Sequence, residues 1–345
     1  MPTAATPSPP PAEGHLADAP VGAEQTEVID PYLRPESRRM LIIVNPYAAT
    51  VSDRLRNLVV YALEGRYEVD AVDTQDRGHA TELCREAAHE GYDVVVAFGG
   101  DGTVNEAANG LAGSSTPLTC LPGGSTNVYC RLLGIPCEIV DATEHVLRMA
   151  DDWRPRRVAL GSANGRYFTF SAGVGLDASV VERVDRHMHL KARLGAYYFT
   201  YVALTTFARR YLLRPPRLVL EPGEAGSRAE VTGVSAVIQN ASPFTYFRGR
   251  RIDIAEGAEL HGSTLSAGVL KRASPVDIPT LLWRIFSQTA RVPRHRQIEA
   301  FEELERARIR SADGRPLPLQ VDGDYIGEVD EAEFGVRSDA LTIVS

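Results

Sequence analysis

The stretch "DVVVAFGGDGTVNEAANGL", residues 93–111, decides how the rest of the chain is interpreted. An apolar run rich in valine ends in Gly99, Gly100, Asp101 and Gly102, and a segment with helical character follows. Glycine at the end of a buried strand lets the backbone approach a bulky group or adopt a positive φ. The stretch therefore predicts a strand, a tight turn and a helix, with one carboxylate at the turn that can serve a metal ion or a proton.

The composition limits the classes of protein. The 345 residues suffice for two domains of ordinary size, and a 44% hydrophobic content predicts a packed core. A net charge of −8 argues against a nucleic-acid coat, so no nucleic-acid partner is expected. The four cysteines form no CxxC pair, which gives no support to a zinc ribbon or a disulfide framework. The longest uncharged stretch, residues 194–208, is shorter than the roughly 18 to 20 residues that span a bilayer.

Three regions differ in pattern. Residues 1–38 are rich in Pro and Ala and are predicted to be a disordered tail. Residues 39–152 alternate strand and helix signals, which predicts a Rossmann-like parallel α/β domain. Residues 153–345 carry short β segments separated by turns, which predicts an antiparallel sandwich or barrel. A helical insertion is expected within it at residues 178–213.

Three strand ends in the α/β part carry polar or glycine-rich turns. They are Asn45-Pro46, Gly99 to Thr103, and Pro122 to Asn127. The carboxyl ends of parallel strands meet at one edge of a sheet, and the helix N-termini there offer backbone N–H groups to phosphate. We expect a polyphosphate cradle at this edge, although the glycines could also be ordinary turns. The GxxxxGK[ST] motif is absent, and a GxGxxG frame fails at Asn105, which disfavours a P-loop kinase and an ordinary dehydrogenase.

Asp101 is the single acid of its loop. A carboxylate beside phosphate would repel it, and Mg²⁺ held by one or two carboxylates plus phosphate oxygens removes that repulsion. Glu106 could add an outer contact to such a site. The alternative is that Asp101 caps the helix that follows it.

Six segments together resemble the diacylglycerol kinase catalytic family, whose soluble bacterial members are similar to sphingosine and ceramide kinases. "GGDGTVNEAANGL" and "PGGSTNVYCRLLG" resemble its nucleotide-binding signature. "NPYAA", "TQDRGHA", "SAGVGLDASVV" and "QVDGDYI" resemble its other elements in order, from about Arg39 to Ser345. GGDGT alone also occurs in NAD kinases and phosphofructokinases, whereas the ordered set favours the lipid kinases.

The resemblance implies an NAD kinase/diacylglycerol kinase-like fold, in which residues 39–152 form the nucleotide-binding α/β domain and residues 153–345 a β-sandwich domain for the lipid substrate. ATP and Mg²⁺ would lie between the two domains. The resemblance also implies that the last residues often pack on the first domain. The acid that ends the family's Asp-Gly-Glu element is its proposed general base, and here that position is Asp324. Asp101 would be the second catalytic residue and the metal ligand. The implied ATP contacts are Asn45, Pro46, Tyr47, Ala48, Ala49, Thr74, Gly100, Asp101, Gly102, Thr103, Val104, Asn105, Glu106 and Ser125.

The chain departs from the family at two places. The family often has Asp after the Asn of the third tip, where this chain has Val128. Bacterial members often carry Asp-Gly near a structural Mg²⁺, where this chain has His261-Gly262, so that metal site is not carried over. Asp322 and Asp324 could also simply form a turn.

The leading interpretation is an ATP-dependent lipid kinase that converts diacylglycerol to phosphatidic acid. A sphingoid-base or other lipid-alcohol kinase and a non-catalytic nucleotide-sensing regulator are the alternatives. We expect a cytoplasmic protein, peripheral at the inner membrane face, and leave a homodimer open. Residues 183–217 hold eight Lys or Arg against the single acid Asp185, which predicts contact with an anionic membrane. A solvated basic rim over a buried helix is the other interpretation.

Overall fold

The computed structural model describes residues 37–186, 198, 200–212, 215–223, 229–247, 249–287 and 290–345. Its first half contains the parallel strands β1 (Arg39–Val44), β2 (Glu68–Asp73), β3 (Val94–Gly99) and β4 (Leu118–Pro122) in the order β2-β1-β3-β4. Every residue of β3 and β4 is buried. Their apolar runs lack alternation because both faces of the sheet are covered.

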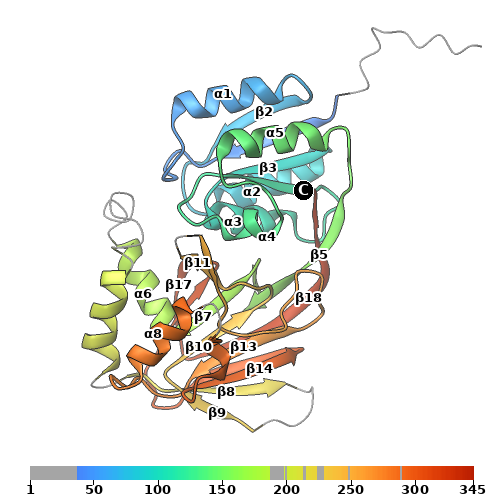
Figure 1. The fold of residues 1–345 in the computed structure, drawn as a ribbon. Coiled ribbons are helices and arrows are strands. Elements are labelled where there is room, and N and C mark those ends of the chain that lie inside the picture. The colour runs from blue at the N-terminus through green and yellow to red at the C-terminus, as the bar shows by residue number, and fades with distance from the viewer. Residues whose placement is uncertain are drawn as a thin grey trace, which may run out of the picture. The chain divides into compact units, whose positions relative to one another are not determined.

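Helices cover both faces of these strands, as Figure 1 shows. They are α1 (Asp53–Leu63), α2 (His79–Glu90), α3 (Asp101–Leu111), α4 (Val128–Leu132) and α5 (Ile139–Met149). Ser52 begins α1 by accepting a hydrogen bond from the N–H of Leu55, and Gly91 ends α2 in the left-handed conformation. Helix α4 is only 5 residues long and was not predicted from the sequence.

The second half contains a six-stranded antiparallel sheet and part of a ten-stranded one. The six strands, in order, are β14 (Ile298–Leu304), β13 (Leu265–Leu270), β10 (Ser235–Gln239), β7 (Ser171–Gly175), β16 (Leu317–Val321) and β17 (Asp324–Val329). Facing them are β5 (Arg156–Ala163), β6 (Arg166–Phe168), β8 (Leu218–Gly223), β9 (Val231–Gly233), β15 (Arg306–Ser311) and β18 (Glu331–Ile343). Val174 and Ile238 of the first sheet share a core with Leu220, Ile309 and Phe334 of the second. The predicted fold class, a parallel α/β part followed by an antiparallel β part, is confirmed.

Strand β18 connects the two halves. It pairs with β5 and β15 in the sandwich, and Ile343 pairs in parallel with Leu118 of β4. The N–H of Gly113 donates to the carbonyl of Ala340 (2.7 Å), and the N–H of Val344 donates to Leu118 (3.1 Å). A single sheet therefore runs from the parallel α/β half into the sandwich, past the predicted boundary at residue 152.

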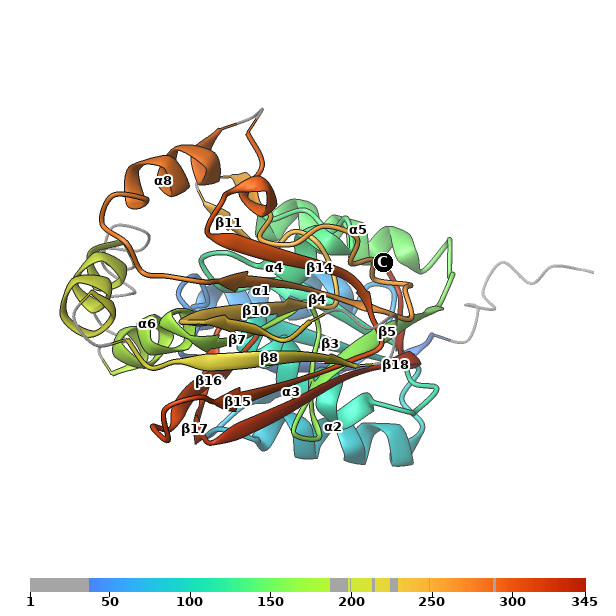
Figure 2. The same cartoon turned by 90° about the horizontal axis from the view of Figure 1, so that it is seen from below.

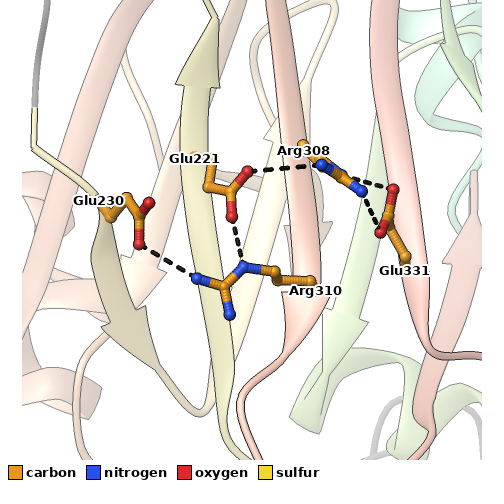
Figure 3. A network of polar contacts seen from close by, with 5 residues as sticks. All are labelled: Glu221, Glu230, Arg308, Arg310 and Glu331. Atoms are coloured by element: carbon orange, nitrogen blue, oxygen red, sulfur yellow. Dashed lines mark hydrogen bonds and ion pairs between the residues drawn. The ribbon is translucent and has the colours of Figure 1, made fainter.

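The outer face of this sheet carries a ladder of charged side chains, shown in Figure 3. Arg308 binds Glu331 through two hydrogen bonds of 2.5 Å, and Arg310 pairs with Glu221 and Glu230. Ala307 and Ile309 of the same strand point into the core, as expected for alternation with period two. These partly exposed pairs mark the solvent face and contribute modestly to stability.

The described part of the predicted insertion is helical. It comprises α6 (Leu176–Asp185), helical residues 200–206 and a π-helix at Phe207–Tyr211. Residues 187–197, 199 and 213–214 of the insertion, and residues 1–36 of the predicted tail, lie outside the described residues.

Further elements of the second half were not predicted from the sequence. They are the strands β15 and β17, the hairpin of β11 (Thr245–Phe247) and β12 (Arg250–Ile252), and helix α8 (Ile278–Phe286), which Figure 2 shows outside the six-stranded sheet. A 3₁₀ turn at Val292–Arg294 follows α8. Among the described residues, no helix is long and apolar enough to cross a membrane.

Because β18 belongs to both halves, we expect a core truncation in it to weaken the whole structure. Leu341 is fully buried, and Leu341→Ala should lower the free energy of unfolding by about 2–5 kcal/mol in urea denaturation. Leu58→Ala is the matched control, since Leu58 is 59% exposed on α1 and should change stability by less than about 0.5 kcal/mol. Equal effects of the two substitutions would contradict this role of β18.

Candidate functional site

The glycine-rich ends of β3 and β4 are in direct backbone contact. A Cβ atom on Gly123 would lie 2.8 Å from the Cα of Gly99, and one on Gly124 would lie 2.8 Å from the Cα of Gly100. The N–H of Gly123 also donates to the carbonyl of Gly99 (2.8 Å). These positions require glycine because any side chain would push the two strand ends apart.

The end of β1 joins the same edge. The side-chain amide of Asn45 donates to the hydroxyl of Thr103 (3.1 Å), and the N–H of Thr50 donates to the carbonyl of Gly123 (3.1 Å). At the neighbouring strand, the N–H of Thr74 donates to Val44 (2.8 Å). The structure thus brings together the predicted residues at the ends of β1, β2, β3 and β4. Of the other predicted contacts, Pro46, Tyr47, Ala49 and Ser125 are exposed and Val104 is buried in the core.

Helix α3 supplies caps to both neighbouring helices. The two oxygens of Asp101 accept hydrogen bonds from the N–H groups of Val128 (3.1 Å) and Tyr129 (3.0 Å) at the start of α4. Glu106 accepts from the N–H groups of Gly78 (2.9 Å) and Ala80 (3.3 Å) at the start of α2. Asp101 therefore caps α4, whereas α3 itself begins after Gly100, which has no side chain to cap it. The expected capping of α3 by Asp101 was wrong, and Glu106 is directed to α2.

Asp101 lies in an environment that disfavours its charge. Burial raises the pKa of Asp101 to about 6, and the nearby carboxylates Asp322 and Asp324 act in the same direction. The hydrogen bonds from Tyr129 and Val128 oppose this shift. A cation at this position would relieve the same cost, because it would compensate the buried negative charge.

Asp322 is a structural carboxylate that holds three segments together. It is 3% exposed, and its backbone has a positive φ of 46° at the turn between β16 and β17. Its oxygens accept hydrogen bonds from the N–H groups of Thr169, Phe170 and Ser171, from the Thr169 hydroxyl and from the Asn105 side chain. Since Asn105 belongs to α3, this one carboxylate attaches the sandwich to the helix that follows GGDG.

Asp324, the predicted general base, lies directly against α3. A Cβ atom on Gly102 would be 2.6 Å from Oδ2 of Asp324, so only glycine at position 102 leaves room for this carboxylate. Asp324 is the first residue of β17 and follows the turn that Asp322 anchors. Two predicted residues from distant parts of the sequence, Asp324 and Asp101, thus lie close together.

A second buried network supports the same turn. The side-chain amide of Gln320 donates to Asp177 (2.6 Å), and its carbonyl oxygen accepts from the N–H of Gly323 (2.8 Å). Burial raises the pKa of Asp177 to about 6, and the hydrogen bond from Gln320 opposes the shift. The "SAGVGLDASVV" segment therefore acts on the turn through Asp177 and Gln320.

A cleft of about 450 Å³ opens beside Asp324. Helices α2 and α3 and the loop before α2 form one wall, and β6 and β17 form the other. The lining residues are Arg77, Gly78, Thr81, Arg85, Glu106, Asn109, Arg166, Asp324, Tyr325 and Ile326. The lining has three guanidinium groups and two carboxylates, those of Glu106 and Asp324. Glu106 already caps α2. Because positive charge is in excess, the cleft suits an anionic ligand.

Two of these arginines also contact the far wall or the core. Arg77 lies 3.6 Å from Asp185 of α6 and donates to the carbonyl of Tyr325 (3.4 Å). Arg166 donates to the side-chain oxygen of Asn105 (3.0 Å), and its buried Nε has no partner among the described residues. Four of the lining residues were not predicted from the sequence: Arg77, Arg85, Arg166 and Asn109. Arg77 stands inside the "TQDRGHA" segment quoted above.

The described arginines of residues 183–217 are partly neutralised within the fold. Arg186 and Arg210 both pair with Glu182, and Arg183 donates to the Thr206 hydroxyl (2.8 Å). Glu182 directly precedes residues 183–217, which contain Asp185 as their single acid. Membrane contact through this segment stays a prediction, and Lys191, Arg193 and Arg214 lie outside the described residues.

The two departures from the family pattern have simple structural settings. Val128 is 2% exposed in the core, so it provides no carboxylate at the start of α4. His261 contacts the carbonyl of Arg157 (3.1 Å). Across the part of the chain that the structure describes, no three His, Cys, Asp or Glu residues come close enough to hold a metal ion by themselves.

Residues 39–163 match the family model described as the diacylglycerol kinase catalytic domain. This match confirms, for that part of the chain, the resemblance found in its motifs. A diacylglycerol kinase of Bacillus subtilis (strain 168) is 35% identical over 168 residues, which cover 47% of this chain and 54% of the relative. A protein of Pseudomonas syringae named "Probable lipid kinase YegS-like" is 32% identical over 173 residues, which cover 50% of this chain and 54% of the relative. The chain thus spans about half the length of these relatives.

Solved structures share the fold over nearly the whole chain. A diacylglycerol kinase structure from Bacillus anthracis str. Sterne aligns with a TM-score of 0.64 at 20% identity, covering 90% of this chain and 98% of that one. A second structure from the same strain gives a TM-score of 0.70 at 23% identity, covering 91% and 97%. At these identities the likeness concerns the fold.

The backbone contact between the strand ends predicts a steric penalty at Gly123. Gly123→Ala should lower the free energy of unfolding by about 1–3 kcal/mol, because the new methyl group would meet the Gly99 backbone. Chemical denaturation measures this change. Gly335→Ala is the control, since a Cβ there would lie an ordinary 3.5 Å from the Ser162 hydroxyl. An unchanged stability of the Gly123 variant would refute the close approach.

Asp177 predicts a pH dependence of stability. Its folded-state pKa of about 6 exceeds the ordinary 3.8, so between these values the folded chain holds a proton that the unfolded chain has lost. This group therefore reduces stability as the pH rises from about 4 to about 6. In Asp177→Asn that loss should disappear, so the fall in unfolding free energy between pH 4.5 and pH 7 should shrink by about 2 kcal/mol relative to the native chain. Parallel pH profiles for the two proteins would contradict the assignment.

Proposed function

We propose that this chain is an ATP-dependent lipid kinase that transfers the γ-phosphoryl group to a lipid hydroxyl, with diacylglycerol as the leading substrate. The observation that carries the proposal is the contact of Asp324 with Gly102. It joins a carboxylate from β17 to the GGDG turn at the start of α3, beside an arginine-lined cleft. The family match over residues 39–163 supports the same reaction class.

The charge of the site supports phosphate binding. The N-terminus of α3 follows two glycines that leave no side chain over its N–H groups, and such a terminus favours anions. Arg77, Arg85 and Arg166 add positive charge in the adjoining cleft. Because phosphoryl transfer depends mainly on positioning and charge neutralisation, these groups supply what the nucleotide requires.

Asp324 is the group we assign to the acceptor hydroxyl. A carboxylate within hydrogen-bond reach can orient the alcohol and take its proton as the new phosphate bond forms. The anchoring of Asp322 and the Gln320–Gly323 contact hold the preceding turn, so the Asp324 carboxylate starts from a fixed backbone. The open face of the cleft beside it leaves space for a second ligand.

Asp101 is the residue that would hold Mg²⁺. Each of its oxygens accepts one backbone hydrogen bond, which leaves lone pairs on both, and burial raises the pKa of this carboxyl group. The remaining ligands would be phosphate oxygens and water, as is usual for this ion. Bound Mg²⁺ would neutralise the charge of the transferring phosphate.

We infer that the chain acts as a peripheral protein at the cytoplasmic membrane face, since its acceptor would be a lipid. The sphingoid-base alternative uses the same site, and the identity of the acceptor depends on a direct assay. A nucleotide-sensing regulator would need the nucleotide site and not Asp324.

The test is transfer of label from Mg-[γ-³²P]ATP to a panel of diacylglycerol, sphingosine and ceramide. We expect labelled phosphatidic acid, and a fall in kcat of about 100-fold or more in Asp324→Asn with nucleotide affinity retained. Asp101→Asn should weaken Mg-nucleotide binding as well as turnover. Calorimetric titration with Mg-ATP separates the two variants.

The matched control is Asp339→Asn, an exposed acid with a φ of 51° that Asn tolerates. It should leave both readouts unchanged. Labelling of sphingosine or ceramide in place of diacylglycerol would show that diacylglycerol is not the acceptor. Nucleotide binding without any labelled lipid would favour the regulator, and full activity of Asp324→Asn would remove the proposed role of this carboxylate.

A further inference from the structure

Helix α8 (Ile278–Phe286) has the sequence "IPTLLWRIF", and its residues Ile278, Leu281 and Ile285 are only partly buried. Among residues 278–285, whose side chains the structure describes, none is buried. Leu282 is 40% exposed, Trp283 is 60% exposed, and Val276 just before the helix is 77% exposed. An apolar helix in a globular domain normally turns its apolar stripe to the core, so this one presents a surface that something else should cover.

The helix is held at its beginning by polar contacts. Asp277 is 3% exposed, pairs with Arg296 and accepts a hydrogen bond from the Gln297 side chain (2.9 Å). The Thr280 hydroxyl donates to the carbonyl of Asp277 (2.9 Å) and contacts the ring of His295 (3.0 Å). At the other end, Arg284 donates to the carbonyl of Arg291 (2.8 Å). The exposed position of Leu282 and Trp283 is therefore fixed by specific contacts and is not the result of a loose end.

Positive charge surrounds this apolar surface. Between positions 271 and 296 the sequence has Lys271, Arg272, Arg284, Arg291, Arg294 and Arg296, and its single acid is Asp277. Acids outside this range pair with two of these residues, Glu299 with Lys271 and Glu256 with Arg291. Asp277 is buried against Arg296, so it presents little negative charge outward. Arg272 and Arg294 are exposed. Apolar and aromatic residues beside a basic rim are the features of a helix that lies in the interface of an anionic bilayer.

The surface is also connected to the site. Helix α8 lies beside β12, which pairs with β11. On β11 the ring of Tyr246 lies under the guanidinium of Arg131 of α4, 4.9 Å away. The N–H groups at the start of α4 hold Asp101. In Figure 2, α8 lies outside the strands of the six-stranded sheet.

We propose that Val276, Leu282 and Trp283, with the surrounding arginines, form a docking surface for an anionic phospholipid bilayer. This inference rests on the proposed function, because a lipid acceptor is what brings the chain to a bilayer. A second copy of the chain is a poorer occupant. One helix of 9 residues offers far less than the roughly 800 Å² per partner of a stable interface, and two copies would bring like charges together.

The first measurement uses tryptophan fluorescence. The chain has two tryptophans, and Trp153 packs against the core under the guanidinium of Arg38. In a Trp153→Phe background, Trp283 reports alone, and its emission should shift to the blue with vesicles of phosphatidylcholine and phosphatidylglycerol but not with phosphatidylcholine alone. An unshifted emission with the anionic vesicles would overturn the proposal.

Co-sedimentation with the same vesicles tests the residues. The double variant Leu282→Ser/Trp283→Ser should bind about tenfold more weakly, and Arg272→Glu/Arg294→Glu should lose about tenfold of the salt-sensitive affinity. Tyr61→Ser is the matched control, since Tyr61 is an exposed aromatic (77%) on α1. Circular dichroism confirms that each variant is folded. Equal binding of the native chain and the double variant would refute the surface.

Two further readouts separate this inference from its alternatives. Phosphorylation of a short-chain lipid in detergent should be unchanged in Leu282→Ser/Trp283→Ser, so a docking defect is distinct from a catalytic one. If the native chain binds vesicles through α8 but phosphorylates no lipid, the docking surface is supported and the proposed lipid-kinase function is refuted. If light scattering showed that the native chain is a dimer and the double variant a monomer, the surface would be assigned to a second copy. That result would overturn the proposal of bilayer docking.

Discussion

The buried carboxylate of Asp322 is the constraint on which the site depends. It gathers three consecutive backbone N–H groups from residues 169–171, one hydroxyl and the Asn105 amide. Burial raises the pKa of Asp322, while these hydrogen bonds favour its charged form. A buried carboxylate is tolerated only where such donors satisfy it, so the turn and α3 must keep their spacing. Because β17 begins directly after this turn, the same spacing places the Asp324 carboxylate against Gly102.

The acids of α3 show how one helix organises its neighbours. Asp101 binds the beginning of α4 and Glu106 binds the beginning of α2, although both had been considered for a metal site. Negative charge at a helix N-terminus is favourable, so these caps stabilise the two helices that flank α3. The same arrangement leaves the N-terminus of α3, beside the glycines, for an external anion. Structural and chemical roles of Asp101 are therefore compatible.

Local patterns predicted the fold class because its strands and helices differ clearly in period. The run before Gly99 and the caps at Ser52 and Gly91 are signals carried by adjacent residues. The clamp at Asp322 could not be predicted in this way, since its donors stand about 150 positions earlier or more. Helix α8 was missed because a mostly apolar run of 9 residues is too short for its period to distinguish a helix from a buried strand. Arg85 and Arg166 were missed because only the folded chain brings them into one cleft.

The insertion of β18 beside β4 bears on how the chain folds. Ile343 and Leu118 pair although 225 positions separate them in the sequence. Such distant pairing requires closure of a very long loop, which makes it slow relative to the local turns and helices. Until β18 pairs with β4, the edge of β4 in the parallel sheet would stay unpaired. An unpaired strand edge is prone to self-association. Folding of the parallel half is thus completed only when β18 of the second half is in place.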